Sequence, residues 1–115
     1  MYRASAKPRP AGTLAALSGE RIAGSANWRL YALSRKSGDW AGAEDVLLQM
    51  LRRRQMSGAV CVELAKLYEH RRKDYTRALD YALQSAGYPD GEPAEQLEKR
   101  VARIRRKMTQ HTEAD

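Results

Sequence analysis

Apolar residues recur along most of this chain at intervals of three and four, the spacing that places them on one face of an α-helix. The clearest such run, over about 40–54, consists of Ala43, Val46, Leu47, Met50 and Leu51. The same spacing predicts further helices over about 27–37, 58–71, 75–86 and 93–109. No segment shows a strand-like alternation of comparable strength. The pattern therefore predicts an all-α fold.

Residues at the predicted boundaries support these helices. Gly38 follows the first one, and a glycine is common just after a helix because it readily adopts a left-handed backbone. Asp39 and Asp74 precede the second and fourth helices, where a carboxylate can accept hydrogen bonds from the free amides of the first turn. Ser57 is expected to cap the third helix in the same way. The Gly- and Pro-containing segment 87–91 separates the fourth helix from the fifth.

Two stretches of the sequence repeat one another 35 residues apart. Residues 38–43 read Gly-Asp-Trp-Ala-Gly-Ala, and residues 73–78 read Lys-Asp-Tyr-Thr-Arg-Ala. Each joins two apolar helical stretches, and a helix–turn–helix unit of this length is typical of stacked α-repeats. Small Ala43 and Ala78 would allow close approach of paired helices. We therefore predict two tetratricopeptide-like helix–turn–helix repeats followed by a C-terminal capping helix.

The domain boundaries follow from composition. Pro8 and Pro10 lie in an N-terminal segment that we expect to be a flexible tail over residues 1–24, so that Ser25 or Asn27 caps the first helix. Leu14 and Leu17 leave one short, loosely held helix over 13–24 as an alternative. The repeat domain is predicted over residues 25–110. Residues 111–115 are expected to be a frayed C-terminus.

Charge and cysteine content restrict the function classes. The chain of 115 residues contains 21 Lys and Arg against 14 Asp and Glu, a net charge of +7. This charge permits binding to nucleic acid, an anionic surface or an acidic protein. No apolar run approaches the roughly 20 residues that span a bilayer, so we expect a cytoplasmic protein without a membrane partner. The single cysteine, Cys61, excludes an intramolecular disulfide, and its apolar surroundings predict a buried side chain.

Catalytic chemistry has little support in the sequence. We find no paired carboxylates, no Cys/His set and no glycine-rich phosphate loop. The two histidines are His70, at the end of a predicted helix, and His111, in the expected frayed end. The chain is therefore predicted not to be an enzyme, with no catalytic residues, no metal and no cofactor.

Two sets of residues are candidates for binding. Trp28 and Tyr31 lie on the first predicted helix, which no repeat precedes, so one of them is expected to be exposed at a protein interface. On the last predicted helix, the candidates for contact with nucleic-acid phosphates are Arg100, Arg103, Arg106 and Lys107. Acidic residues come first in that helix and basic residues last, the order that the helix dipole favours, so a solvated helix face stays an alternative.

The turn residues Gly38, Asp39, Trp40 and Ala43, and again Asp74, Tyr75 and Ala78, resemble the start of the second helix of a tetratricopeptide repeat. More narrowly, three segments in order resemble the C-terminal helical region of bacterial YprB-type ribonuclease H-like exonucleases. These segments are Leu64–Tyr75, Ala78-Leu79 and Leu97–Lys107. In that family a nuclease domain precedes such repeats.

The resemblance implies an accessory region rather than the nuclease itself. The family's nuclease domain holds divalent metal with several acidic residues, whereas Glu20 is the one carboxylate before the first predicted repeat. We therefore expect a non-catalytic interaction module that binds a protein partner, such as a nuclease domain. Direct binding of nucleic acid through the basic last helix is the alternative.

Overall fold

The computed structural model describes the backbone of residues 9–114 and the side chains of residues 23–110. Within this range the chain is all-α, as predicted, and contains no strand. The elements, in order, are α1 (Arg9–Lys36), α2 (Trp40–Arg52), α3 (Ser57–Leu67), the short π-helix η1 (Tyr68–Arg72), α4 (Tyr75–Ser85) and α5 (Ala94–Ala114).

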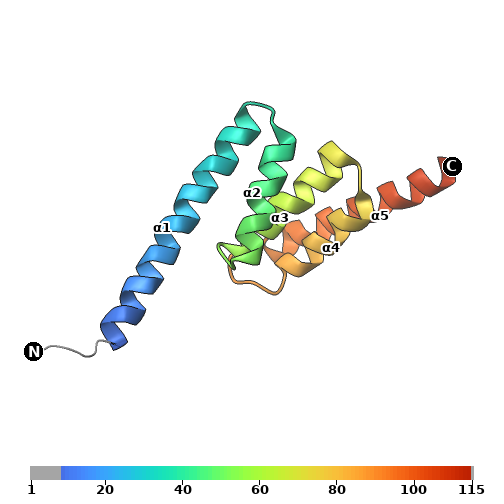
Figure 1. The fold of residues 1–115 in the computed structure, drawn as a ribbon. Helices are drawn as coiled ribbons and strands as arrows, with labels where there is room; N and C mark the ends of the chain where they lie inside the picture. The colour runs from blue at the N-terminus through green and yellow to red at the C-terminus, as the bar shows by residue number, and fades with distance from the viewer. Residues whose placement is uncertain (1–8, 115) are drawn as a thin grey trace, which may run out of the picture.

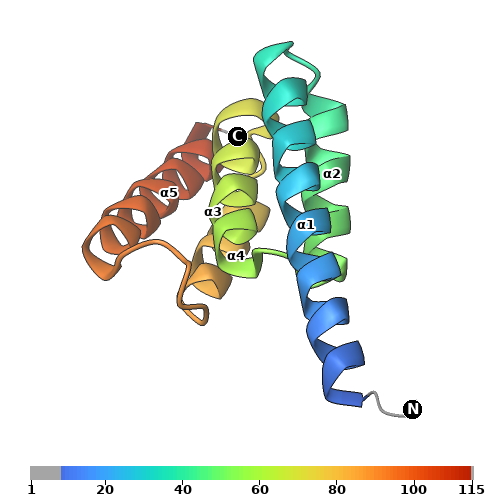
Figure 2. The ribbon, with the colours of Figure 1, turned by 90° about the vertical axis from the view of Figure 1, so that its left-hand side faces the viewer.

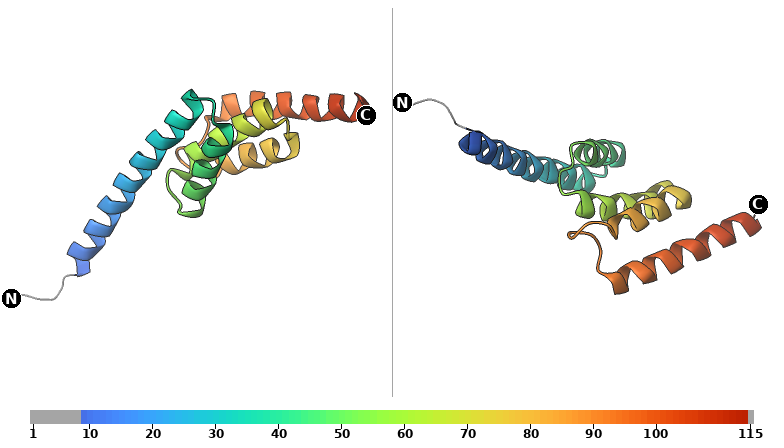
Figure 3. Two further views of the ribbon diagram at one scale, coloured as in Figure 1. Left: turned by 45° about the horizontal axis from the view of Figure 1, so that its top comes forward. Right: turned by 90° about the horizontal axis from the view of Figure 1, so that it is seen from below.

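The helices are stacked in sequence order (Figure 1). α1 and α2 form one antiparallel hairpin, and α3 and α4 form a second one. α2 packs against α3, and α5 packs against α4, so that the hairpins and the last helix lie side by side (Figure 2). The two ends of the described chain lie at opposite ends of the molecule (Figure 3). The assignment of the hairpins to the tetratricopeptide class stays a prediction.

The first helix is much longer than the sequence pattern indicated. α1 begins at Arg9 instead of near residue 27, so residues 9–24 are helical and do not form the expected tail; residues 1–8 lie outside the described range. Pro10 is compatible with this start because the first turn of a helix needs no amide hydrogen from it. The Ala- and Leu-containing stretch that follows has high helix propensity. This part of α1 projects beyond the other helices (Figures 1 and 2).

The other helix ends fall close to the predicted ones, with two exceptions. α5 continues to Ala114, so the expected fraying from residue 111 is not observed up to that residue. Neither Ser25 nor Asn27 begins a helix, and the Asn27 amide instead donates to Gln55 Oε1 over 2.9 Å, which joins α1 to the turn after α2.

Both predicted aspartate caps are confirmed. Asp39 Oδ1 accepts a hydrogen bond from the Gly42 amide at 2.9 Å, and Asp74 Oδ1 accepts one from the Arg77 amide at 3.2 Å. Gly38 has a φ of +82°, the left-handed conformation that ends α1. Both hairpin turns therefore follow from local sequence.

The cap of α3 was predicted wrongly. Ser57 makes no capping hydrogen bond, and the residue before it, Met56, has a left-handed φ of 49°. Instead, Asp90 in the loop between α4 and α5 accepts hydrogen bonds from the amides of Gly58, at 3.0 Å, and Ala59, at 3.3 Å. Gly58 allows this approach because a Cβ there would collide with the Asp90 carboxylate. The loop between α4 and α5 thus supplies the cap of α3 that was expected from Ser57.

The core lies between the hairpins and extends to α5. Ala43 and Ala78 are fully buried, as expected for small residues at which paired helices approach closely. Ile104 brings α5 into the same core. Cys61 is buried as predicted, and its burial raises the pKa of the thiol. Other large, fully buried core side chains are Leu47, Met50, Val60 and Leu64.

Candidate functional site: two glutamate-centred clusters on the third helix

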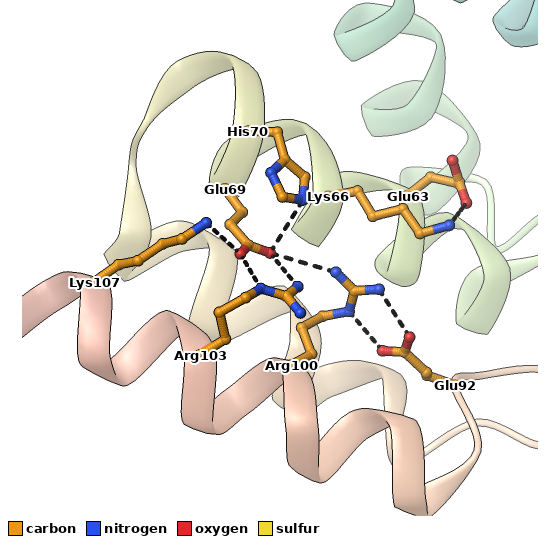
Figure 4. Close-up of polar contacts among 8 residues, drawn as sticks. All are labelled: Glu63, Lys66, Glu69, His70, Glu92, Arg100, Arg103 and Lys107. Atoms are coloured by element: carbon orange, nitrogen blue, oxygen red, sulfur yellow. Dashed lines mark hydrogen bonds and ion pairs between the residues drawn. The ribbon is translucent and has the colours of Figure 1, made fainter.

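The helical stretch formed by α3 and η1 carries two glutamates, Glu63 and Glu69, and each contacts several basic side chains. Figure 4 shows the group around Glu69 and, beside it, Glu63 with Lys66. Glu69 faces α5, and Glu63 faces α1. The two groups differ in their burial, and this difference separates a structural contact from a candidate binding site.

The Glu69 cluster fastens η1 to α5. Glu69 is fully buried, and Arg103 Nε and Nη2 donate to its two carboxylate oxygens at 2.6 and 2.8 Å. Lys107 Nζ adds a third hydrogen bond at 2.8 Å. Such a two-pronged arginine–carboxylate pair fixes both distance and orientation. The cluster therefore sets how α5 lies on the second hairpin.

Arg100 bridges this cluster to the loop before α5. Its Nε and Nη2 donate to the two carboxylate oxygens of Glu92 at 2.7 and 2.9 Å, and its Nη1 lies 3.4 Å from Glu69 Oε1 (Figure 4). Only 12% of the Arg100 side chain is exposed. Arg100 is thus held between two carboxylates.

The charges around Glu69 change its acidity. Burial by itself raises the pKa of this carboxyl, but the hydrogen bonds from Arg103 and Lys107 and the neighbouring positive charges outweigh burial and lower the pKa to about 2. Burial also lowers the pKa of His70, and so do the nearby cations of α5, against an opposing effect of Glu69. At neutral pH Glu69 is therefore ionised, whereas His70 is mainly neutral.

These contacts bear on the residues predicted to bind nucleic acid. The structure places Arg100, Arg103 and Lys107 together, but around carboxylates of the same chain. Of the four, Arg106 is exposed and forms no ion pair within the described part of the chain. Sequence reasoning missed Glu69 as their partner, because 34 residues separate it from Arg103.

The second cluster borders a pocket of about 250 Å³ between the two hairpins. Side chains from α1, from the first turn of α2, from α3 and from η1 form its wall. They are Tyr31, Arg35, Trp40, Glu63, Lys66, Leu67, His70 and Arg71. The pocket therefore exists only because the hairpins are stacked.

Glu63 organises the charged side of this pocket. The Tyr31 hydroxyl donates to Glu63 Oε1 at 2.6 Å, Arg35 Nη1 lies 3.3 Å from the same oxygen, and Lys66 Nζ lies 3.0 Å from Oε2. Burial, followed by the hydrogen bond to Glu63, raises the pKa of the Tyr31 hydroxyl, which stays protonated. The side chains of Arg35 and Lys66 are 51% and 44% exposed, so both cations reach solvent.

Aromatic side chains form the other side. These are Tyr31 and Trp40, and the Arg71 guanidinium lies over the Trp40 ring at 4.3 Å from its centroid. Outside the pocket lining, the Trp28 ring contacts Tyr31 with 5.3 Å between the ring centroids. Trp40 is half-buried. Arg71 is exposed, and within the described residues its guanidinium makes no hydrogen bond or ion pair.

The structure places the two residues predicted for a protein interface, of which one was expected to be exposed. Tyr31 is only 3% exposed and belongs to the core, where its hydroxyl donates to Glu63, so it is not the exposed member. Trp28 is half-buried beside it. Sequence reasoning missed Glu63, Arg35 and Lys66. The i,i+3 spacing of Glu63 and Lys66 was the one local signal for this site.

Comparisons with known proteins identify no relative of this chain. No protein-family model matches the chain, and searches of curated proteins and of solved structures give no significant match. Within the described residues no group of His, Cys, Asp and Glu side chains could hold a metal ion. Among the helices in that range, none has the length and apolar character needed to cross a membrane.

Proposed function

We propose that this chain is a non-catalytic, cytoplasmic interaction module that docks a peptide segment of a protein partner in the pocket between its two hairpins. The observation that carries the proposal is the pocket itself, whose wall combines aromatic, aliphatic and solvent-facing cationic side chains. Concave sites with a few convergent polar groups are where ligands bind most often.

The properties of the wall favour a peptide. The half-buried Trp40 offers apolar contact, while Arg35, Lys66 and Arg71 offer hydrogen-bond donors around it. Tryptophan and arginine are also the residues that most often dominate the binding energy of protein interfaces. Packing of the module on a nuclease domain, as the resemblance to ribonuclease H-like exonucleases implies, stays a proposal about the partner's identity.

A peptide-display selection against the immobilised chain tests this function. Enriched peptides should bind the wild-type chain and lose roughly tenfold in affinity with Trp40→Ala, which removes one wall of the pocket. Tyr88→Ala is the matched control, because Tyr88 is an exposed aromatic residue outside the pocket. Circular dichroism of each variant checks that helicity is retained. Failure to enrich any peptide, or equal binding by Trp40→Ala, would refute the proposal.

The alternative function, nucleic-acid binding through α5, has a separate test. Fluorescence anisotropy with labelled single- and double-stranded RNA and DNA over a salt series should show affinity that falls steeply with salt if phosphates are bound. Arg106→Ala should then weaken binding, because Arg106 is the exposed member of the predicted set and forms no ion pair within the described residues. The engagement of Arg100, Arg103 and Lys107 by Glu69 and Glu92 is the reason that we rank this alternative second.

A further inference from the structure

The charges that border the pocket do not balance. Among its lining residues, Glu63 is the one carboxylate, whereas Arg35, Lys66 and Arg71 are all cationic. His70 also lines the pocket, but burial lowers its pKa, so it adds a hydrogen-bonding group at neutral pH and little charge. The pocket therefore carries an excess of two positive charges at neutral pH.

This excess is available to a ligand. Arg35 and Lys66 share the single carboxylate of Glu63, and each keeps about half of its side chain in contact with solvent. Arg71 is held in place by its stacking on Trp40 and keeps its hydrogen-bond donors unused within the described residues. A guanidinium fixed in this way loses little freedom when it binds an anion.

The charges lie beside an apolar surface. The half-buried ring of Trp40 lines the same pocket as Lys66 and Arg71, above the almost fully buried Leu67. A ligand that fits both surfaces carries an anionic group next to an apolar one. A volume of about 250 Å³ corresponds to one or two side chains rather than to a folded element.

From this geometry we infer that the pocket selects acidic peptides, with a side-chain oxyanion bound by Lys66, Arg35 and Arg71 and a neighbouring apolar side chain against Trp40. The inference rests on the proposed docking function and specifies its ligand. The oxyanion is a carboxylate of Asp or Glu, or a phosphate ester on a modified side chain, since both present oxygen acceptors to arginine and lysine.

Glu63 makes a peptide a better ligand than a nucleic-acid strand. Its carboxylate, with oxygens 3.0 and 3.3 Å from Lys66 and Arg35, lies within the site and would repel a continuous row of phosphates. A peptide places one or two negative charges where the cations are and leaves the Glu63 side of the pocket to neutral groups.

The test uses the full chain and fluorescein-labelled short peptides with blocked ends. One pool randomises Leu, Asp and Glu, a matched neutral pool randomises Leu, Asn and Gln, and a third replaces the acidic residues with phosphoserine. The acidic pool should bind, the neutral pool should bind at least roughly tenfold more weakly, and salt should reduce the difference. Tighter binding of the phosphoserine pool would identify the phosphate ester as the oxyanion. Equal binding of the acidic and neutral pools would overturn the inference and leave peptide docking intact.

Three variants locate the binding. Arg71→Gln should lower the affinity for the acidic pool by roughly fivefold. Glu63→Gln should raise that affinity by roughly threefold, because the change removes the competing carboxylate. The glutamine amide introduced by Glu63→Gln can still accept the hydrogen bond from Tyr31. Arg53→Gln removes the same charge at an exposed position outside the pocket and should change affinity little.

Opposite effects of Arg71→Gln and Glu63→Gln cannot arise from a general loss of structure, so these two variants keep the test decisive if either is less stable. An equal loss with Arg53→Gln would show that only net charge matters and would overturn the inference. The inference would also be overturned if the peptides failed to bind and single-stranded RNA bound instead, with an affinity that Arg71→Gln lowers and Glu63→Gln raises.

Discussion

Glu63 and Glu69 lie on the same helical stretch and each gathers several cations, yet they have different surroundings. α5 covers Glu69, which is fully buried, and supplies Arg100, Arg103 and Lys107. Glu63 lies beside an open pocket, and its partners Arg35 and Lys66 remain half in solvent. In the Glu69 cluster all three cations are engaged by the carboxylates of Glu69 and Glu92. At the pocket, three cations surround the single carboxylate of Glu63.

The difference shows that burial, more than charge, decides what such a cluster does. A buried carboxylate that loses its partners costs several kcal/mol, whereas a solvent-exposed ion pair contributes about 0–1 kcal/mol. The Glu69 cluster is therefore able to hold two parts of the fold together. Although Glu63 is only 12% exposed, its partners Arg35 and Lys66 are half-exposed and can turn to another anion at less cost, which is what ligand binding requires.

The largest effect is expected from Glu69→Gln. The amide cannot neutralise Arg103 and Lys107, which would stay confined beside it, so the free energy of unfolding should fall by about 3 kcal/mol. Urea denaturation followed by circular dichroism measures this. Glu95→Gln, at an exposed position on α5, is the control and should change stability by less than about 0.5 kcal/mol. A similar small change in both variants would mean that α5 is not held by the Glu69 cluster.

Acid should remove nearly as much stability through the same group. The pKa of Glu69 is lowered to about 2 in the folded chain, below the ordinary value of 4.5. Its contribution is therefore complete above about pH 4.5 and is lost as the pH falls toward 2, a change of roughly 3 kcal/mol. The measurement is unfolding free energy against pH for the wild type and Glu69→Gln. The gap between the two curves should close over this range, and a constant gap would contradict the assignment.

Tyr31→Phe tests the corrected role of Tyr31. The change removes a 2.6 Å hydrogen bond to an ionised carboxylate and leaves the ring in the core, so stability should fall by about 1.5 kcal/mol. Tyr88→Phe, at an exposed tyrosine, is the matched control and should have no measurable effect in thermal or urea unfolding. If Tyr31→Phe were equally silent, the hydroxyl would not be bound as described.

The smallest effect on stability is expected from Glu63→Gln. Glu63 is 12% exposed, but its partners Arg35 and Lys66 are half-exposed, so they can be solvated after the change. Glutamine can also keep the hydrogen bond from Tyr31, so the loss should stay below about 1 kcal/mol. Urea unfolding beside Glu69→Gln gives the direct comparison. A loss as large as that of Glu69→Gln would mean that both clusters are structural.

Local features of the sequence predicted much of the fold. The periodicity of apolar residues gave the helices, and Asp39 and Asp74 gave the hairpin turns, because capping involves residues only three apart. The start of α1 was misjudged, since prolines near a terminus also suit the first turn of a helix. The cap of α3 was missed because it comes from Asp90, more than 30 residues away.

The candidate site was less predictable than the helices. The basic residues of α5 were found from the sequence, but their role depends on Glu69, which no local rule connects to them. Trp28 and Tyr31 were identified as a possible interface with one of them exposed; the pocket includes Tyr31, which is buried, and Trp28 is half-buried.

The sequence by itself determined the all-α character, most helix boundaries, the burial of Ala43 and Ala78 and the excess of positive charge. Only the tertiary structure decided which cations that excess leaves available. The physical reason is that periodicity and capping depend on neighbours a few residues apart, whereas pairing and burial depend on which helix faces meet. Because α5 covers Glu69 and leaves the side of α3 facing α1 open, two similar glutamates came to hold the fold in one case and to border a pocket in the other.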